Sequence, residues 1–245
     1  MKLDTKQKNT VVFVVKIIIC TLGLILLGIG SGMNLGADQG ADPITVFYDG
    51  LSINFGCSAG QVATMLNAGL IIIVLLFDYF SALKKFKSGV LQSSSEIIPA
   101  MFKHIHVGTV IYLLVLGAFM DFGIWVYNKF SVYIPTVAFG GFNVSQIIVS
   151  LIGCVLCFVG LGGFMASDVG IDPWTAIVLI ISEKTQKPFK FIKIILDAIT
   201  LVFGWLMGGV VGLITLFCVF VGGPIIQKSA ELLDKSFKKV LKSKL

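Results

Sequence analysis

Six apolar stretches constrain the fold of this chain of 245 residues more than any other feature. Most are about 18 to 22 residues long, which is the length that an α-helix needs to cross a hydrocarbon core about 30 Å thick. Only 13% of the residues are charged, whereas a soluble domain carries roughly 25%. The sequence predicts an all-α membrane protein, a single polytopic domain over 1–245, with six transmembrane helices at about 11–32, 61–79, 107–127, 145–165, 191–208 and 210–227.

A polar motif occurs twice, as GADQGADPIT at 36–45 and ASDVGIDPWT at 166–175. An ungapped superposition of 22–45 on 152–175 matches nine of 24 positions. An internal repeat of this kind has to be explained by the fold before anything else. The motif residues shared by the two copies are Asp38 and Asp168, Gly40 and Gly170, Asp42 and Asp172, Pro43 and Pro173, and Thr45 and Thr175.

The repeat extends to whole halves of the chain, because VGTVIYLLVLGAFMD at 107–121 resembles VGLITLFCVFVGGPII at 211–226. Repeat A covers about 11–127 and repeat B about 141–229. Each repeat holds three spans, an odd number, so the second copy enters the membrane from the opposite side. The sequence therefore predicts two inverted three-helix repeats.

A break interrupts each repeat directly after its first span. Gly40 and Gly170 allow a sharp backbone turn, while Pro43 and Pro173 suit the first turn of a new helix. The apolar piece that follows is about ten residues long and too short to span the bilayer. We expect a short re-entrant or interfacial half-helix after each break.

Lysine supplies the whole positive charge, because the net charge is +6 and the chain has no arginine. An excess of lysine marks cytoplasmic loops. The connections after the first and third spans hold only Lys129. Six spans with both termini in the cytoplasm, and a basic cytoplasmic tail at 230–245, satisfy this pattern. The other lysines that set the orientation are Lys2, Lys6, Lys8, Lys84, Lys85, Lys87, Lys103, Lys184, Lys187 and Lys190.

Two breaks facing each other would form a polar site near the bilayer midplane, where irregular backbone must line a cavity or be buried in protein. Asp42 and Asp172 either cap the half-helices locally or bind a ligand or proton directly. Asp197 is a functional candidate because a carboxylate within a span is costly, but it also forms an i,i+4 pair with Lys193. The expected substrate-binding or ion-coupling residues are Asp42, Asp172, Thr45, Thr175, Asn67 and Asp197.

Other polar residues have simpler interpretations. Asp38 and Asp168 are expected in solvated loops, and Asp121 near an interface. His104 and His106, beside Lys103, suggest a cytoplasmic loop rather than a metal site. Lys16 can extend back to the cytoplasmic surface.

Enzyme chemistry is not expected. Tyr48-Asp49 resembles half of an intramembrane aspartyl protease site, but the chain has no G-x-G-D. It also lacks an H-E-x-x-H sequence and a membrane-embedded Ser/His pair. We expect no cofactor, no metal centre and no nucleic-acid partner.

The chain resembles the bacterial YczE-like membrane proteins, relatives of the YyaS/YitT group. The resemblance covers about 11–230 and rests on SGMNLGADQGADPITVFYDGLSINFGCSAGQ, GLGGFMASDVGIDPWTAIVLIISEKT and GWLMGGVVGLITLFCVFVGGPIIQ. That family has a small residue or serine before the proline, where this chain has Asp42 and Asp172, so the resemblance assigns these two no role. It implies a multi-pass protein of the bacterial inner membrane.

These features favour a small secondary transporter or permease that moves a small polar solute or ion by alternating access between inverted repeats. The alternative is a non-transporting membrane protein that scaffolds or regulates a partner complex. Besides the lipid bilayer and the solute, the sequence leaves room for a homo-oligomer.

Overall fold

The computed structural model describes residues 5–90, 93–135, 137–139 and 142–244. Lys2, and residue 141 at the predicted start of repeat B, lie outside this range. Five helices in the described part are long and apolar enough to cross a membrane. These candidate spans are Asn9–Gly36, Ala59–Lys87, Val107–Tyr133, Val144–Ser167 and Leu213–Ser236.

The described residues are almost entirely helical, which confirms the predicted all-α class. The α-helices are α1 (Thr5–Gly36), α2 (Pro43–Phe55), α3 (Ala59–Lys87), α4 (Ile97–Met101), α5 (Val107–Phe130), α6 (Val144–Ser167), α7 (Pro173–Thr185), α8 (Phe189–Leu206) and α9 (Leu213–Lys244). Two 3₁₀ turns (Ser94–Glu96 and Ser131–Tyr133) and a hairpin of β1 (Ala138–Phe139) and β2 (Phe142–Asn143) complete the described elements.

The long helices differ from the sequence prediction in three places. The predicted span at 191–208 forms α8, but its 18 residues include Lys190, Lys193 and Asp197, so it is not among the five candidate spans. The second predicted span extends to Lys87. The last one continues as a single helix, so the predicted tail at 230–245 is helical as far as Lys244.

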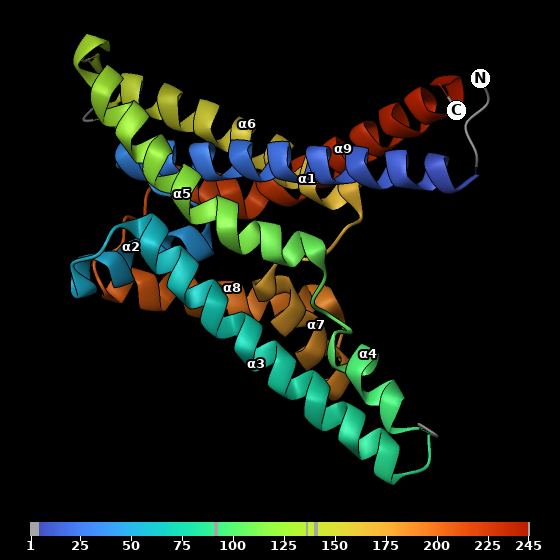
Figure 1. Ribbon diagram of the computed structural model, residues 1–245. Helices are drawn as coiled ribbons and strands as arrows, with labels where there is room; N and C mark the ends of the chain where they lie inside the picture. The colour runs from blue at the N-terminus through green and yellow to red at the C-terminus, as the bar shows by residue number, and fades with distance from the viewer. Residues whose placement is uncertain (1–4, 91–92, 136, 140–141, 245) are drawn as a thin grey trace.

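The helices form two layers (Figure 1). In one layer, α1 packs against α5 and α6, and α6 packs against α9. In the other, α2 packs against α3 and α8, and α7 packs against the same two helices. Contacts between α3 and α5 join the layers. The beginning of α1 and the end of α9 lie at the same end of the molecule (Figure 1).

Helices α1 and α6 approach each other closely at two pairs of glycines. A Cβ added at Gly23 would lie 2.6 Å from the carbonyl oxygen of Gly160, and a Cβ added at Gly160 would lie 2.5 Å from that of Gly23. Gly30 and Gly153 are in the same relation. From the first pair to the second, the residue number rises in α1 and falls in α6, so the two helices are antiparallel. Small residues at such crossings allow backbones to touch.

Each motif glycine packs against the glycine that begins the last long helix of the other half. Gly40 lies against Gly212 before α9, and Gly170 lies against Gly108 in α5. Backbone hydrogen bonds accompany both contacts. The Ile214 N–H donates to the Gln39 carbonyl at 3.1 Å, and the Gly108 N–H donates to the Val169 carbonyl at 3.0 Å. The two breaks are therefore anchored by long helices and do not stand as free loops.

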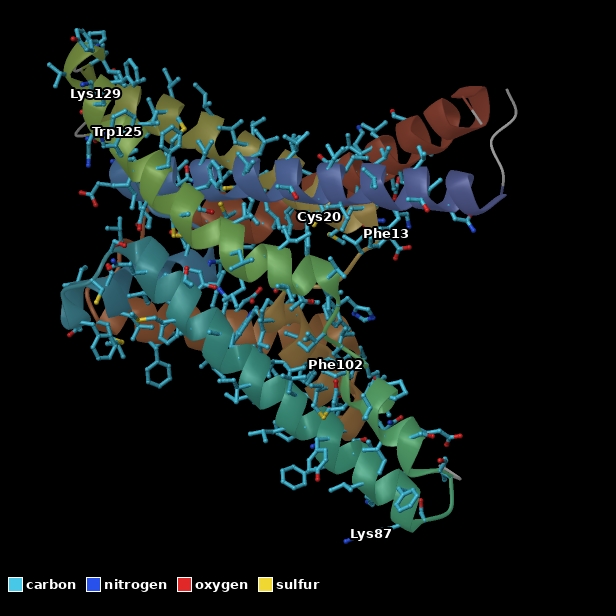
Figure 2. All side chains as sticks on the ribbon, in the orientation of Figure 1. Phe13, Cys20, Lys87, Phe102, Trp125 and Lys129 are labelled. Carbon is cyan, nitrogen blue, oxygen red and sulfur yellow. The ribbon has the colours of Figure 1, made fainter. Side chains whose placement is uncertain are left out.

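The outer surface of the long helices is apolar. Exposed side chains include Leu114 on α5, Val155 on α6 and Phe220 on α9, as suits helices that face lipid. Lysine side chains mark the ends: Lys87 and Lys129 lie at opposite ends of the molecule (Figure 2).

Candidate functional site

Both short helices begin in the same way. Asp42 precedes Pro43 in α2, and its carboxylate accepts the Thr45 N–H at 3.4 Å. Asp172 precedes Pro173 in α7, and its carboxylate accepts the Thr175 N–H at 2.8 Å. The structure thus shows the capping role for both aspartates. Asp–Pro specifies this start locally, because Asp is a favoured N-cap and proline suits the first helical position.

Tyr48 and Asn67 form a buried pair beside the first motif. The Nδ2 group of Asn67 donates to the Tyr48 hydroxyl at 2.9 Å and to the Ala63 carbonyl at 2.7 Å. Both side chains are 1% exposed. The Oδ1 atom of Asn67 has no hydrogen-bond partner among the described residues. A buried acceptor without a partner is rare in native proteins and calls for an explanation.

Each motif is held by the last long helix of the other half. The Thr109 hydroxyl on α5 donates to the Ile171 carbonyl of the second motif at 2.7 Å, and the Ile214 N–H of α9 donates to the Gln39 carbonyl of the first motif at 3.1 Å. Tyr112 on α5 is a second buried tyrosine.

Asp197 on α8 is already neutralised. Its carboxylate accepts from Lys193 at 2.9 Å and from the Trp174 indole N–H at 3.2 Å. The predicted i,i+4 pair is thus present, and Trp174 ties it to α7. Asp197 is therefore half of an ion pair.

The two threonines lie in the first turns of α2 and α7. Thr45 is 2% exposed, and Thr175 is partly buried. Their backbone N–H groups are bound by the capping aspartates. Of the six predicted site residues, Asn67 forms the buried polar centre with Tyr48. The two aspartates and the two threonines form the helix starts, and Asp197 is paired with Lys193.

The outer aspartates of each motif do not join the centre. Asp38 and Asp168 adopt positive φ values of 56° and 51° at the ends of α1 and α6, a conformation that Asp tolerates better than most residues. Both are exposed, as predicted. Asp168 forms an ion pair with Lys16 at 3.2 Å.

The side chain of His104 turns inward from its loop. His104 lies between α4 and α5, in a loop as predicted, but it is buried and its Nδ1 lies 2.8 Å from Oδ1 of Asp78 on α3. Beside it, Lys103 pairs with Glu183 at the end of α7, and this hydrogen bond lowers the pKa of Glu183. A cavity of about 260 Å³ borders Asp78 and Lys103. No periodic pattern in the sequence indicates that this side chain is buried.

Sequence analysis also missed Tyr48 as the partner of Asn67 and Trp174 as a partner of Asp197. Tyr48 corresponds to Val178 and Trp174 to Ile44 in the repeat, so the self-comparison could not single them out. Within the described residues, no group of three His, Cys, Asp or Glu side chains is placed to hold a metal ion.

Comparison with known proteins agrees with the helical membrane architecture. The chain is 24% identical to the uncharacterized membrane protein YczE of Bacillus subtilis (strain 168) over 208 residues, which cover 84% of this chain and 81% of YczE. It is 20% identical to the uncharacterized protein YyaS of the same organism over 216 residues, which cover 88% of this chain and 92% of YyaS. No solved structure matches. Residues 14–230 match the family of unknown function DUF6198, and the chain belongs to this family of membrane proteins.

Proposed function

We propose that the protein is a small secondary transporter that moves a small polar solute or ion across a bacterial membrane by alternating access, without covalent chemistry. One observation carries the proposal: each of the two helix breaks packs against the last long helix of the other half, and a buried polar pair, Tyr48 and Asn67, follows the first break. Buried polar groups are costly within a membrane protein and usually mark a pathway or a ligand site. Transporter sites commonly lie where interrupted helices meet.

The reciprocal glycine contacts support two inverted repeats. In the repeat, Gly23 corresponds to Gly153 and Gly30 to Gly160. The contact of Gly23 with Gly160 is therefore the counterpart of the contact of Gly153 with Gly30. A twofold axis between antiparallel α1 and α6 maps one contact onto the other. Alternating access then arises when one half rocks against the other about this axis.

In this proposal α8 is the sixth span, and α2 and α7 are re-entrant. The Lys193–Asp197 pair reduces the cost of placing charge on α8. Each short helix has 13 residues and is about 20 Å long, less than the hydrocarbon core of about 30 Å.

The orientation follows from the ends at which lysines lie. The start of α1 and the ends of α3, α7 and α9 carry most of the lysines, whereas Lys129 lies at the other end (Figure 2). By the positive-inside rule, both termini are cytoplasmic.

The contacts at the two ends of α3 suggest how access could change. At the lysine-rich end, Asp78 binds the His104 loop, while Lys103 of that loop binds Glu183 on α7. At the other end, Asp121 on α5 accepts from Ser58 and from the Gly60 N–H at 2.9 Å. Opening the lysine-rich end requires Lys103 and Glu183 to separate. Exposed ion pairs are weak enough for this.

Flux through proteoliposomes tests the proposal. Purified full-length protein would be reconstituted and assayed with a broad panel of labelled amino acids, sugars, organic acids, amines and inorganic ions, with and without proton and sodium gradients. We expect saturable uptake of at least one class, reduced at least tenfold in Asp172→Asn. Protein that folds and reconstitutes but moves none of the panel would favour the scaffold function instead.

A further inference from the structure

We infer that Asp78, His104 and Glu183 form a proton-binding site at the lysine-rich end of α3, where the ring nitrogen Nε2 of His104 takes up a proton from solvent. The bound proton links α3 to α7 through the imidazole ring. The site is argued from the contacts of these three side chains. Its effect on transport rests on the proposed function, which makes this end cytoplasmic.

The carboxylate of Asp78 is buried, and His104 is its partner. The side chain of Asp78 is 5% exposed. Its Oδ2 accepts the His104 backbone N–H at 3.2 Å, and Nδ1 of the ring lies 2.8 Å from Oδ1 and 3.0 Å from Oδ2. No lysine forms an ion pair with Asp78 in the described part of the chain. A buried carboxylate without a cation is costly, so a protonated imidazole is the group that balances it.

Asp78 also determines which ring nitrogen of His104 is free. An ionised carboxylate only accepts hydrogen bonds, so Nδ1 carries the hydrogen that lies between the two side chains. Nε2 of the neutral ring is then an acceptor. It faces Oε1 of Glu183 on α7 at 3.8 Å, which is also an acceptor. One proton on Nε2 supplies the donor that this contact lacks.

The proton also balances the charges of the cluster. Lys103 lies 2.8 and 2.6 Å from the two carboxylate oxygens of Glu183, so its charge is used there and the charge of Asp78 is left over. Opposite charges within about 4–6 Å favour the charged form of a titratable group, whereas burial opposes it. Here the imidazolium of His104 lies beside a buried carboxylate, so protonation removes net buried charge.

The other charged groups nearby are directed elsewhere. Lys184, next to Glu183 on α7, lies 3.9 Å from the ring centre of Phe77. Lys85 on α3 and His106 at the end of the loop are exposed. Exposed charges are screened by solvent and salt. The two carboxylates that face the His104 ring therefore dominate its electrostatic surroundings.

Solvent comes close to the site on both sides of the ring. On one side, the cavity of about 260 Å³ borders Asp78 and continues to Ser81 and Lys85, which are exposed. A water molecule takes about 30 Å³, so the cavity has room for several. On the other side, the side chain of Glu183 is 54% exposed and has the freedom to shorten its 3.8 Å contact. A proton delivered by this water binds the lone pair of Nε2, and no covalent bond is broken.

Nitrogen-15 NMR of the histidine rings tests the inference, because the chain has only two histidines. Full-length His106→Gln protein with ring-labelled histidine would be titrated in detergent from about pH 8 to about pH 5, which spans the ordinary histidine pKa of about 6.5. At the upper end Nδ1 of His104 should carry a hydrogen and Nε2 none. At the lower end both nitrogens should carry one.

Three substitutions in this background assign the carboxylates. Asp78→Asn and Glu183→Gln should each lower the titration midpoint of the His104 ring by roughly half a pH unit or more, because a unit charge at about 4 Å has this effect even in water. Asp121→Asn is the matched control, since it removes a partly buried carboxylate beside the start of α3, and should leave the midpoint unchanged. Circular dichroism and gel filtration check the fold. If Asp78→Asn does not fold, the exposed Glu183→Gln decides.

Several results would overturn the inference: a ring that stays neutral down to the lowest pH, a ring already doubly protonated at the highest, Nδ1 without a hydrogen in the neutral ring, or the same midpoint with and without the Glu183 carboxylate.

The proposed function fails differently. In proteoliposomes, acidic buffer on the lysine-rich side should slow flux at least twofold in wild type and not in His104→Gln, because the proton holds that end closed. Proton uptake by His104 without any flux would remove transport and keep the site. Flux without proton uptake by His104 would remove the site and keep transport.

Discussion

Asn67 on α3 donates its amide N–H to the Tyr48 hydroxyl on α2 at 2.9 Å, and its amide oxygen has no partner in the described part of the chain. This hydrogen bond joins the short helix α2 to the long helix α3, while the acceptor of the Asn67 amide stays unused. An arrangement selected for stability alone would satisfy that oxygen, because a buried unpaired acceptor costs about 1–3 kcal/mol.

Replacing the pair by apolar residues therefore separates stability from function. Tyr48→Phe alone should destabilise the protein by about 0.5–1.5 kcal/mol, the usual value of one hydrogen bond. Tyr48→Phe combined with Asn67→Leu removes both partners and the unpaired oxygen, and should be as stable as wild type or more stable. Thermal melts of the single and double variants measure this. A double variant less stable than either single variant would contradict it.

Two substitutions at each capping aspartate separate its capping role from the role of its charge. Asp42→Ala removes the cap as well as the charge and should lower stability by about 1 kcal/mol. Asp42→Asn keeps the cap and should leave the free energy of unfolding within about 0.5 kcal/mol of wild type. Asp172→Ala and Asp172→Asn provide the matched pair on α7. If Asn destabilises as much as Ala, the cap depends on charge and the proposed division of roles is wrong.

The close approach of α1 and α6 depends on glycine. Gly23→Ala would place a Cβ 2.6 Å from the Gly160 carbonyl oxygen, and overpacking of this kind costs about 1–3 kcal/mol. Gly69→Ala in α3 is the control, because nothing lies within 4 Å of its Cβ position and Ala favours a helix by roughly 0.5–1 kcal/mol over Gly. Unfolding measurements should show a lower free energy of unfolding for Gly23→Ala and a higher one for Gly69→Ala. A change of the same sign in both variants would count against the glycine crossing.

The Lys103–Glu183 pair predicts a pH dependence. The pKa of Glu183 is lowered from 4.5, first through its hydrogen bond with Lys103, and the ring of His104 also faces it. A lowered pKa in the folded state means that the pair stabilises above pH 4.5 and that this contribution is lost as the pH falls through the lowered value. The stability difference between wild type and Glu183→Gln should be small, because the pair is exposed, and should shrink on acidification. A difference that does not shrink as the pH falls below 4.5 would contradict this assignment.

The parts of the fold that were predicted from sequence depend on local signals. Asp42-Pro43 and Asp172-Pro173 mark helix starts because capping acts within three residues. The long apolar stretches mark spans because length and composition suffice. The YczE-like resemblance is confirmed by the similarity of the chain to YczE and YyaS.

The missed parts depend on partners distant in sequence. His104 is buried because Asp78, 26 residues away, accepts from both its ring and its backbone N–H. Tyr48 contacts Asn67 on α3, and Trp174 contacts Asp197 on α8. No periodic pattern in the sequence predicts these contacts. The length of α9 was underestimated because its last turns are basic rather than apolar.

Two-sided accessibility of Thr175, at the start of α7, tests alternating access most directly. In a background in which Cys20, Cys57, Cys154, Cys157 and Cys218 are replaced, Thr175→Cys would be treated in oriented vesicles with a membrane-impermeant maleimide from either face. Lys129→Cys and Lys87→Cys, at opposite ends of the molecule (Figure 2), are the single-sided controls. We expect the cysteine at 175 to react from both faces. Reaction from one face only, under every condition, would contradict alternating access.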